Sequence, residues 1–104
     1  MVGEIHLAKI YFTDFSSYKI RPVFVIKQLG DDCVCLQLTS KSKSDRITID
    51  NDNLLSGEIK LKSFVVIPKN FTIHRDLLFK KIATVNDKKT SEIFNHFCIE
   101  IGCE

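Results

Sequence analysis

Residues 18–40 have the sequence YKIRPVFVIKQLGDDCVCLQLTS, and the fold expected for the rest of the chain follows from this stretch. Val23 to Ile26 form an unbroken apolar run, which is typical of a strand that is covered on both faces. Gly30-Asp31-Asp32 predicts a turn. After the turn, Val34, Leu36 and Leu38 alternate with Cys33, Cys35 and Gln37, which indicates a second strand. The stretch therefore predicts a β-hairpin.

Polar groups stand at the outer ends of these two predicted strands. Arg21-Pro22 precedes the first apolar run, and Thr39-Ser40 ends the second strand. A tight turn between antiparallel strands brings such ends together. A guanidinium and two hydroxyls are then close enough to hold a phosphate group.

The composition indicates one folded domain over residues 1–104. Apolar residues make up 44% of the chain and charged residues 27%, as in globular rather than disordered proteins. No apolar run approaches the ~20 residues of a membrane span. Residues 1–4 (MVGE) lack the basic and apolar regions of a secretory signal. We therefore expect a cytoplasmic protein that does not enter a membrane.

The net charge does not identify a ligand. A formal value of +2 does not by itself predict nucleic-acid binding. Basic residues do gather beside the hairpin, namely Lys19, Arg21, Lys27, Lys41 and Lys43. A solvated surface is the commoner explanation for such a cluster.

The four cysteines predict packing rather than metal binding. Cys33 and Cys35 share one face of a strand at a spacing that is tight for a zinc pair, and the histidines do not follow at zinc-finger spacing. Without a secretory signal, a disulfide framework is not expected. We expect reduced thiols and no cofactor.

Further short strands and one helix are expected outside the hairpin. Alternating or continuous apolar residues predict strands at 4–10, 46–50, 64–67, 71–73 and 82–85, and Pro68 is expected to end the third of these. Residues 75–81 favour one or two helical turns.

The C-terminal segment changes to a helical period. Apolar residues from Ile93 to Ile101 recur on one helix face, Asp87 or Thr90 is expected to cap the helix, and Gly102 to stop it. Five to seven short strands with one terminal helix predict a mainly β protein built on a small, strongly bent sheet or barrel.

Short motifs occur in a set order along nearly the whole chain. They are Gly3-Glu4-Ile5, Phe12-Thr13-Asp14, Lys19-x-Arg21-Pro22, Leu38-Thr39-Ser40, Ser63-Phe64-Val65-Val66, Phe71-Thr72-Ile73 and Ile82-Ala83-Thr84-Val85. In this order the chain resembles the MazF/PemK (Kid-type) toxins of bacterial type II toxin–antitoxin modules. The resemblance implies an SH3-like small β-barrel of the MazF/PemK/CcdB type with a C-terminal helix. It also implies a homodimer that cleaves single-stranded RNA without a metal and is neutralised by a cognate antitoxin.

The resemblance assigns catalytic roles to Arg21 and Thr39. The ribose 2′-OH attacks the adjacent phosphate, and Arg21 suits the stabilisation of the added charge because a guanidinium stays protonated. Alternatively, Arg21 pairs with an acid such as Asp14 or Asp50 at a strand edge. Thr39 and Ser40 match the phosphate-binding pair of the family, whereas a turn-forming cap is the structural alternative.

RNA-binding roles are expected for residues around this pair. The resemblance suggests Thr13, Asp14, Lys19, Ser40 and Lys41 as groove residues. Phe12, Phe15 and Tyr18 are candidates for stacking on unpaired bases. Packing in the core or at a dimer interface is the alternative for these aromatics.

The chain departs from the family pattern at two positions. Some members carry an arginine and an acid where this chain has Val66 and Pro68, so that version of proton transfer is not available here. His74, next to the Thr-Ile pair, is a candidate proton acceptor because of its intrinsic pKa. His6 is expected to face solvent or a partner subunit.

These departures support an alternative function, a non-catalytic SH3-like barrel that binds a protein or nucleic-acid partner. A gyrase-poisoning family shares the fold, but no residues of this sequence convincingly match its functional residues.

Overall fold

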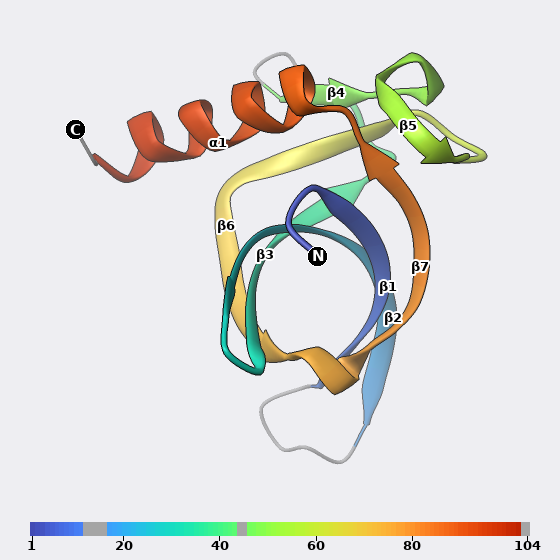
Figure 1. Cartoon of the computed structure of the whole chain (residues 1–104), viewed down its shortest axis with the longest axis vertical. Coiled ribbons are helices and arrows are strands. Elements are labelled where there is room, and N and C mark those ends of the chain that lie inside the picture. Colours follow the sequence, from blue (N-terminus) through green and yellow to red (C-terminus); the bar gives the residue numbers. More distant parts are fainter. Residues whose placement is uncertain (12–16, 44–45, 103–104) are drawn as a thin grey trace.

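The computed structural model describes residues 1–11, 17–43 and 46–102. Its strands form one antiparallel sheet in the order β4-β6-β3-β2-β1-β7-β5, which curls into a half barrel with α1 across one end (Figure 1). The elements in chain order are β1 (Glu4–Tyr11), β2 (Tyr18–Leu29), β3 (Asp32–Thr39), β4 (Ile47–Ile49), η1 (Asn51–Asn53), β5 (Leu54–Gly57), β6 (Ser63–His74), η2 (Arg75–Leu77), β7 (Leu78–Val85) and α1 (Asp87–Ile101). The predicted class, mainly β with a C-terminal helix, is confirmed.

Strand β2 has apolar clusters on both of its faces. Val23 and Val25 belong to a cluster with Cys33 and Cys35 of β3, which we call the thiol cluster. Phe24 and Ile26 belong to a larger cluster that includes residues of α1 such as Ile93 and Phe97, which we call the helix cluster. Because neighbours in a strand point to opposite faces, this two-sided burial explains the unbroken apolar run of the sequence.

Irregular pairing bends the two longest strands. The β2–β3 register shifts between Val25 and Lys27, and the β3–β6 register jumps from Asn70 to Val66. Such bulges kink a strand and increase its twist. Pro68 lies in the second bulge, where its missing N–H removes no ladder hydrogen bond. The prediction that Pro68 ends a strand is therefore wrong, because β6 continues through it.

Helix α1 starts and ends at defined caps. The side chain of Asn86 accepts a hydrogen bond from the backbone N–H of Lys89 at 2.8 Å, so Asn86 is the N-cap and the expectation of Asp87 or Thr90 is wrong. Gly102 adopts φ 81° and ends the helix as predicted. None of the helices in the described part of the chain has the length and apolar character needed to cross a membrane.

Other boundaries differ from the sequence prediction. The helical turns were expected over 75–81, but the structure has only the short helix η2, and β7 begins at Leu78. The segment from Leu54 to Gly57 forms β5, an edge strand that the sequence analysis did not predict. Its exposed, mixed sequence carries no clear alternation, which explains the omission.

The two cysteines of β3 are free thiols. Cys33 and Cys35 are fully buried, in agreement with the expected packing role, and Cys98 is partly buried on α1. Burial raises the pKa of Cys35 to about 12, and it also raises the pKa of Cys33. Both thiols of β3 are therefore protonated at neutral pH and unreactive in the folded state.

Gly57 offers a test of how β5 packs on β7. Both Gly57 and Gly30 have positive φ, but a Cβ at Gly57 would meet the carbonyl oxygen of Ile82 and, at 2.8 Å, the Cα of Ala83, whereas one at Gly30 would meet nothing within 4 Å. We expect Gly30→Ala to cost about 1 kcal/mol of unfolding free energy and Gly57→Ala about 1–3 kcal/mol more. Urea unfolding of both variants measures the difference, and equal costs would contradict this packing.

Candidate functional site

Arg21 lies in the part of β2 that pairs only with β1. It stands opposite Ala8, and its side chain is exposed. Its Nη1 is 3.4 Å from the carbonyl oxygen of Ile20, a long and weak contact. Within the described parts of the chain, no carboxylate lies at ion-pairing distance from this guanidinium. Arg21 therefore presents its charge to solvent.

The alternative partners of Arg21 do not hold it in place. Asp50 instead caps η1, where its side chain accepts a hydrogen bond from the backbone N–H of Asp52 at 3.0 Å. Pairing of Arg21 with Asp50 is therefore not what the structure shows. Asp14 lies outside the described residues.

Thr39 ends β3 and is half-buried opposite Phe64 of β6. Its hydroxyl oxygen accepts a hydrogen bond from the backbone N–H of Lys41 at 3.2 Å. The hydroxyl therefore caps a turn, as the structural alternative expected, but its own proton remains available for a second hydrogen bond. Capping and phosphate binding by Thr39 are thus compatible.

The sheet register relates Arg21 to Thr39. The pairing of β2 with β3 ends at Val23 opposite Gln37, which lie two residues from Arg21 and from Thr39 respectively. Residues two apart in a strand share a face, and directly opposed residues share it too. Arg21 and Thr39 therefore stand on the same face of the sheet, just beyond the point where β2 and β3 cease to pair. We call this the thiol-cluster face, because Val23 and Val25 lie on it.

The expected RNA-binding residues fall into three groups. Lys19 is exposed and shares the thiol-cluster face with Arg21. Ser40 and Lys41 are exposed in the turn that follows β3. Thr13 and Asp14, together with Phe12 and Phe15, lie outside the described residues.

Tyr18 stands on the face opposite to Arg21. It pairs with Tyr11 of β1, and the two rings are 5.4 Å apart. The Lys9 ammonium lies 5.2 Å above the Tyr18 ring and 5.8 Å from the Phe79 ring. This aromatic group is exposed at the strand ends. It does not adjoin Arg21, so a base held by Tyr18 would lie on the other side of the sheet.

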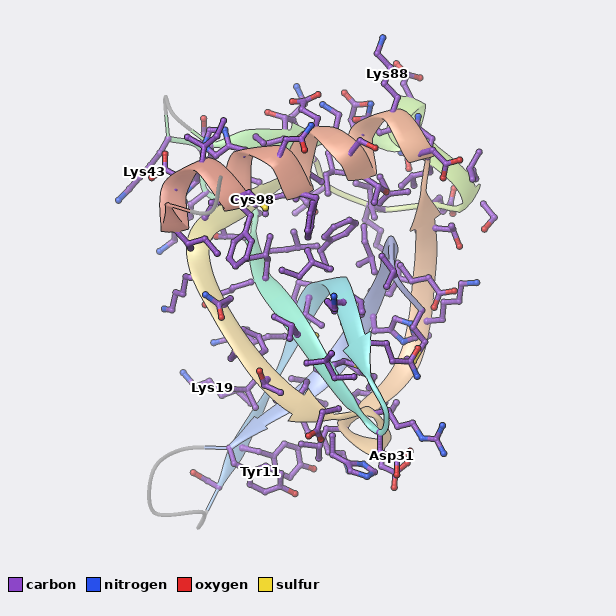
Figure 2. All side chains as sticks on the ribbon, turned by 60° about the vertical axis from the view of Figure 1, so that its left-hand side comes forward. Tyr11, Lys19, Asp31, Lys43, Lys88 and Cys98 are labelled. Carbon is purple, nitrogen blue, oxygen red and sulfur yellow. The ribbon has the colours of Figure 1, made fainter. Side chains whose placement is uncertain are left out.

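His74 does not approach the Arg21–Thr39 region within one chain. It pairs with Asp32 at the start of β3, seven residues from Thr39, which corresponds to about 23 Å along the strand. Its Nδ1 accepts the backbone N–H of Asp76 at 3.1 Å and so caps η2. Figure 2 shows the neighbouring Asp31 at the end of the sheet farthest from α1. His74 is therefore not part of the candidate site within one chain.

His6 is buried, so the expectation that it faces solvent or a partner is wrong. Only 6% of it is exposed, and it stands opposite Val23 on the thiol-cluster face. Its Nε2 lies 2.8 Å from Oε1 of Glu4, whose other oxygen is 3.2 Å from Nζ of Lys81. The buried Nδ1 has no hydrogen-bond partner among the described atoms.

Burial and hydrogen bonding oppose each other at Glu4. Burial alone raises the pKa of this carboxyl, but the hydrogen bonds from His6 and Lys81 outweigh it and leave the pKa below the ordinary value of 4.5. Glu4 is therefore ionised at neutral pH, and it joins β1 to β7.

A polar pocket that the sequence analysis missed adjoins β6 at Val66. Its volume is about 180 Å³, and Arg46 and His96 line it together with Val66. Arg46 and His96 stand 50 residues apart, and neither belongs to a motif of the sequence, so only the fold could bring them together. Val66 itself offers no polar group, as the sequence indicated.

A larger pocket lies at the other end of β2. It measures about 530 Å³ between β2 and α1, and its apolar walls include Phe24, Ile26 and Phe94. Because Phe24 and Ile26 belong to the helix cluster, this pocket lies on the face of β2 opposite to Arg21.

Comparison with known proteins identifies the fold and the family. The family model described as PemK-like, MazF-like toxin of type II toxin–antitoxin system matches residues 2–100. No match is found among curated proteins.

Three solved structures illustrate the likeness. The chain is 15% identical to an endoribonuclease in complex with its cognate antitoxin from a mycobacterial species, with a TM-score of 0.73 over 100% of this chain and 94% of that one. It is 17% identical to the Mycobacterium tuberculosis toxin MazF-mt6, with a TM-score of 0.73 over 97% and 98%. The MazE–MazF structure from Deinococcus radiodurans gives 13% identity and a TM-score of 0.75 over 99% and 96%. These likenesses confirm the predicted MazF-like barrel.

The Glu4 cluster predicts a pH dependence of stability. Because the folded-state pKa of Glu4 is lowered, its contribution is complete above pH 4.5 and is lost as the pH falls through the folded-state value. We expect the wild-type protein to have a higher free energy of unfolding than Glu4→Gln at pH 7. This difference in unfolding free energy should become smaller below pH 4.5. Urea unfolding from pH 7 to 3 measures this, with Glu58→Gln, at an exposed site, as the control. A gap that stays constant with pH would contradict the prediction.

Proposed function

The chain belongs to the family of PemK-like, MazF-like toxins of type II toxin–antitoxin systems, and on this premise we propose that it is a metal-independent endoribonuclease of single-stranded RNA such as mRNA. One observation carries the proposal. Arg21 and Thr39 stand on the same face of the sheet where β2 and β3 cease to pair, and the Arg21 guanidinium faces solvent. A phosphate placed there receives donors from both strands.

The proposed reaction is a transesterification within the RNA. The ribose 2′-oxygen gives up its proton to solvent water and attacks the adjacent phosphorus, and the bond from phosphorus to the 5′-oxygen of the next nucleotide breaks. The leaving oxygen takes up a proton, and a 2′,3′-cyclic phosphate remains on the upstream fragment. No protein nucleophile is consumed, so the protein acts by alignment and charge stabilisation.

Arg21 and Thr39 together align the phosphate and stabilise its added charge. The guanidinium stays charged and can donate to two phosphate oxygens at once, so it stabilises the charge added at phosphorus. The Thr39 hydroxyl, held by Lys41 at its oxygen, donates its proton to a phosphate oxygen. We propose Ser40, Lys41, Lys19, Thr13 and Asp14 as contacts for the flanking nucleotides.

We further propose two protein partners. One is a second copy of this chain, in a homodimer, and the other is a cognate antitoxin that covers the RNA groove. The mycobacterial endoribonuclease, whose fold this chain shares, is in complex with its cognate antitoxin. Residues 1–104 act as one toxin unit in this proposal.

A second candidate function is a barrel that binds RNA or protein without cleaving it. Val66 supports it, since this residue on β6 has no group that transfers protons or binds phosphate. The two functions differ in whether RNA is cut, and one experiment distinguishes them.

Incubation of the purified protein with a defined single-stranded RNA in excess EDTA tests the nuclease. We expect cleavage at specific sites that leaves cyclic phosphate ends, and we expect Arg21→Ala to lower the rate about 10²–10³-fold through loss of charge stabilisation. Gel analysis of end-labelled RNA measures both.

The matched control is Arg75→Ala. Arg75 is also exposed, but it lies in η2, where its Nε is 3.4 Å from Asp31. This variant should cleave at the wild-type rate. Undiminished cleavage by Arg21→Ala would refute the assignment, and failure of the wild-type protein to cleave any RNA would favour the binding module.

Thr39→Val separates catalysis from turn formation. The change keeps the shape of the side chain and removes the hydroxyl, which costs about 1 kcal/mol of stability through the bond to Lys41. We expect turnover to fall by tenfold or more, beyond what this loss explains. Thr72→Val, an exposed threonine of β6 opposite Val34, is the control. If turnover and stability fall in proportion, Thr39 serves only as a cap.

A further inference from the structure

The small pocket beside Val66 has the charge and size for one anionic group. It measures about 180 Å³ and is lined by Lys43, Arg46, Val66, Ile67, His96 and Glu100. Three of these residues are basic types and one is an acid. Figure 2 shows Lys43 near the C-terminal end of α1, where the segment before β4 approaches the helix.

The one carboxylate of this lining is engaged by a neighbour. Oε1 of Glu100 lies 3.6 Å from Nε2 of His96, one helical turn earlier on α1. The carboxylate is therefore engaged, while Lys43 and Arg46 bring two positive charges to the same lining. The balance of charge favours a ligand with at least one negative charge.

Arg46 connects this pocket with Thr39. Its Nη1 donates to the carbonyl oxygen of Lys41 at 2.9 Å, and the N–H of Lys41 donates to the Thr39 hydroxyl at 3.2 Å. The backbone of Lys41 is thus held between the two side chains. A guanidinium has five N–H donors, so Arg46 keeps others for a ligand.

The sheet also brings the pocket close to Thr39. Val66, which lines the pocket, lies two residues beyond Phe64, the residue opposite Thr39. Diagonal neighbours of this kind are about 7–8 Å apart in an antiparallel pair. A strand of nucleic acid that passes Thr39 therefore runs within reach of Arg46.

We propose that this pocket binds a backbone phosphate of single-stranded RNA, next to the phosphate that Arg21 and Thr39 hold. Arg46 and His96 donate to its oxygens, and Lys43 adds charge. The inference rests on the proposed function, which supplies the first phosphate. Arg46 is in addition a positioning residue, because it holds the Lys41 backbone that the Thr39 hydroxyl contacts.

Binding of a single-stranded DNA 12-mer tests the pocket apart from cleavage, since DNA lacks the 2′-OH that the proposed reaction needs. Fluorescence anisotropy over a range of salt gives Kd and its salt dependence. We expect Arg46→Gln to weaken binding about tenfold and to reduce the slope of log Kd against log salt by about 0.7, the loss of one phosphate contact. Arg75→Gln removes the same charge at the far end of the sheet and should change neither.

Two further variants keep the test decisive if Arg46→Gln disturbs the turn. His96→Gln leaves the Lys41 bonds intact and should still weaken binding several-fold. Glu100→Gln removes the carboxylate and should tighten it. Glu92→Gln, on the same helix but paired with Lys89 at 3.2 Å, should have no effect.

Wild-type affinity and salt slope in both Arg46→Gln and His96→Gln would overturn the proposal. So would binding of an oligo-glutamate peptide that requires these residues while the oligonucleotide does not, because the pocket would then serve an acidic peptide. Failure of the nuclease is separate from both results. If no RNA is cleaved but Arg46→Gln still weakens oligonucleotide binding, the assignment of the phosphate pocket is supported. Only the proposed nuclease activity is then refuted.

Discussion

The burial of β2 on both faces is the constraint on which the rest of the structure depends. Val23 and Val25 pack in the thiol cluster, while Phe24 and Ile26 pack in the helix cluster. A slip of one residue would exchange the two sets and put every side chain of β2 on the wrong face. The same register orients Arg21, two residues before Val23. The face of the sheet from which the Arg21 side chain projects is therefore set by apolar packing.

Much of this architecture could be predicted from sequence, since it rests on local patterns. Local sequence indicates whether each residue of β2 and β3 is buried, through the apolar run of β2 and the alternation in β3. The glycine at the C-terminal end of α1 is a local signal of the same kind. The continuity of β6 could not be predicted, because Pro68 is tolerated only through a bulge that depends on the pairing with β3. The capping of α1 by Asn86 was missed because several polar residues in a row were equally suitable by type.

In the candidate site, too, residues in local motifs could be predicted from the sequence, whereas long-range contacts could not. Arg21 and Thr39 were predicted from a family motif, and the register explains how two motifs 18 residues apart come to share a face. His74 was proposed from its place beside a motif, and the long path of β6 carries it to the opposite end of β3. Arg46 and His96 meet at one pocket only because α1 crosses the sheet near β4. Contacts of this kind are set by the path of the chain, and no spacing in the sequence reports them.

The two outermost strands of the sheet are very short. β4 has three residues and β5 has four, and they are the two ends of the strand order. Each covers only part of its neighbour, because β4 pairs with residues 63–65 of β6 and β5 pairs with residues 83–85 of β7. In the described part of the chain, the rest of both long strands has no strand on its outer side. Uncovered strand edges are the places where a sheet can pair with a further strand, so copies of this barrel at high concentration depend on twist and covering groups, and not on short edges, to avoid edge-to-edge association.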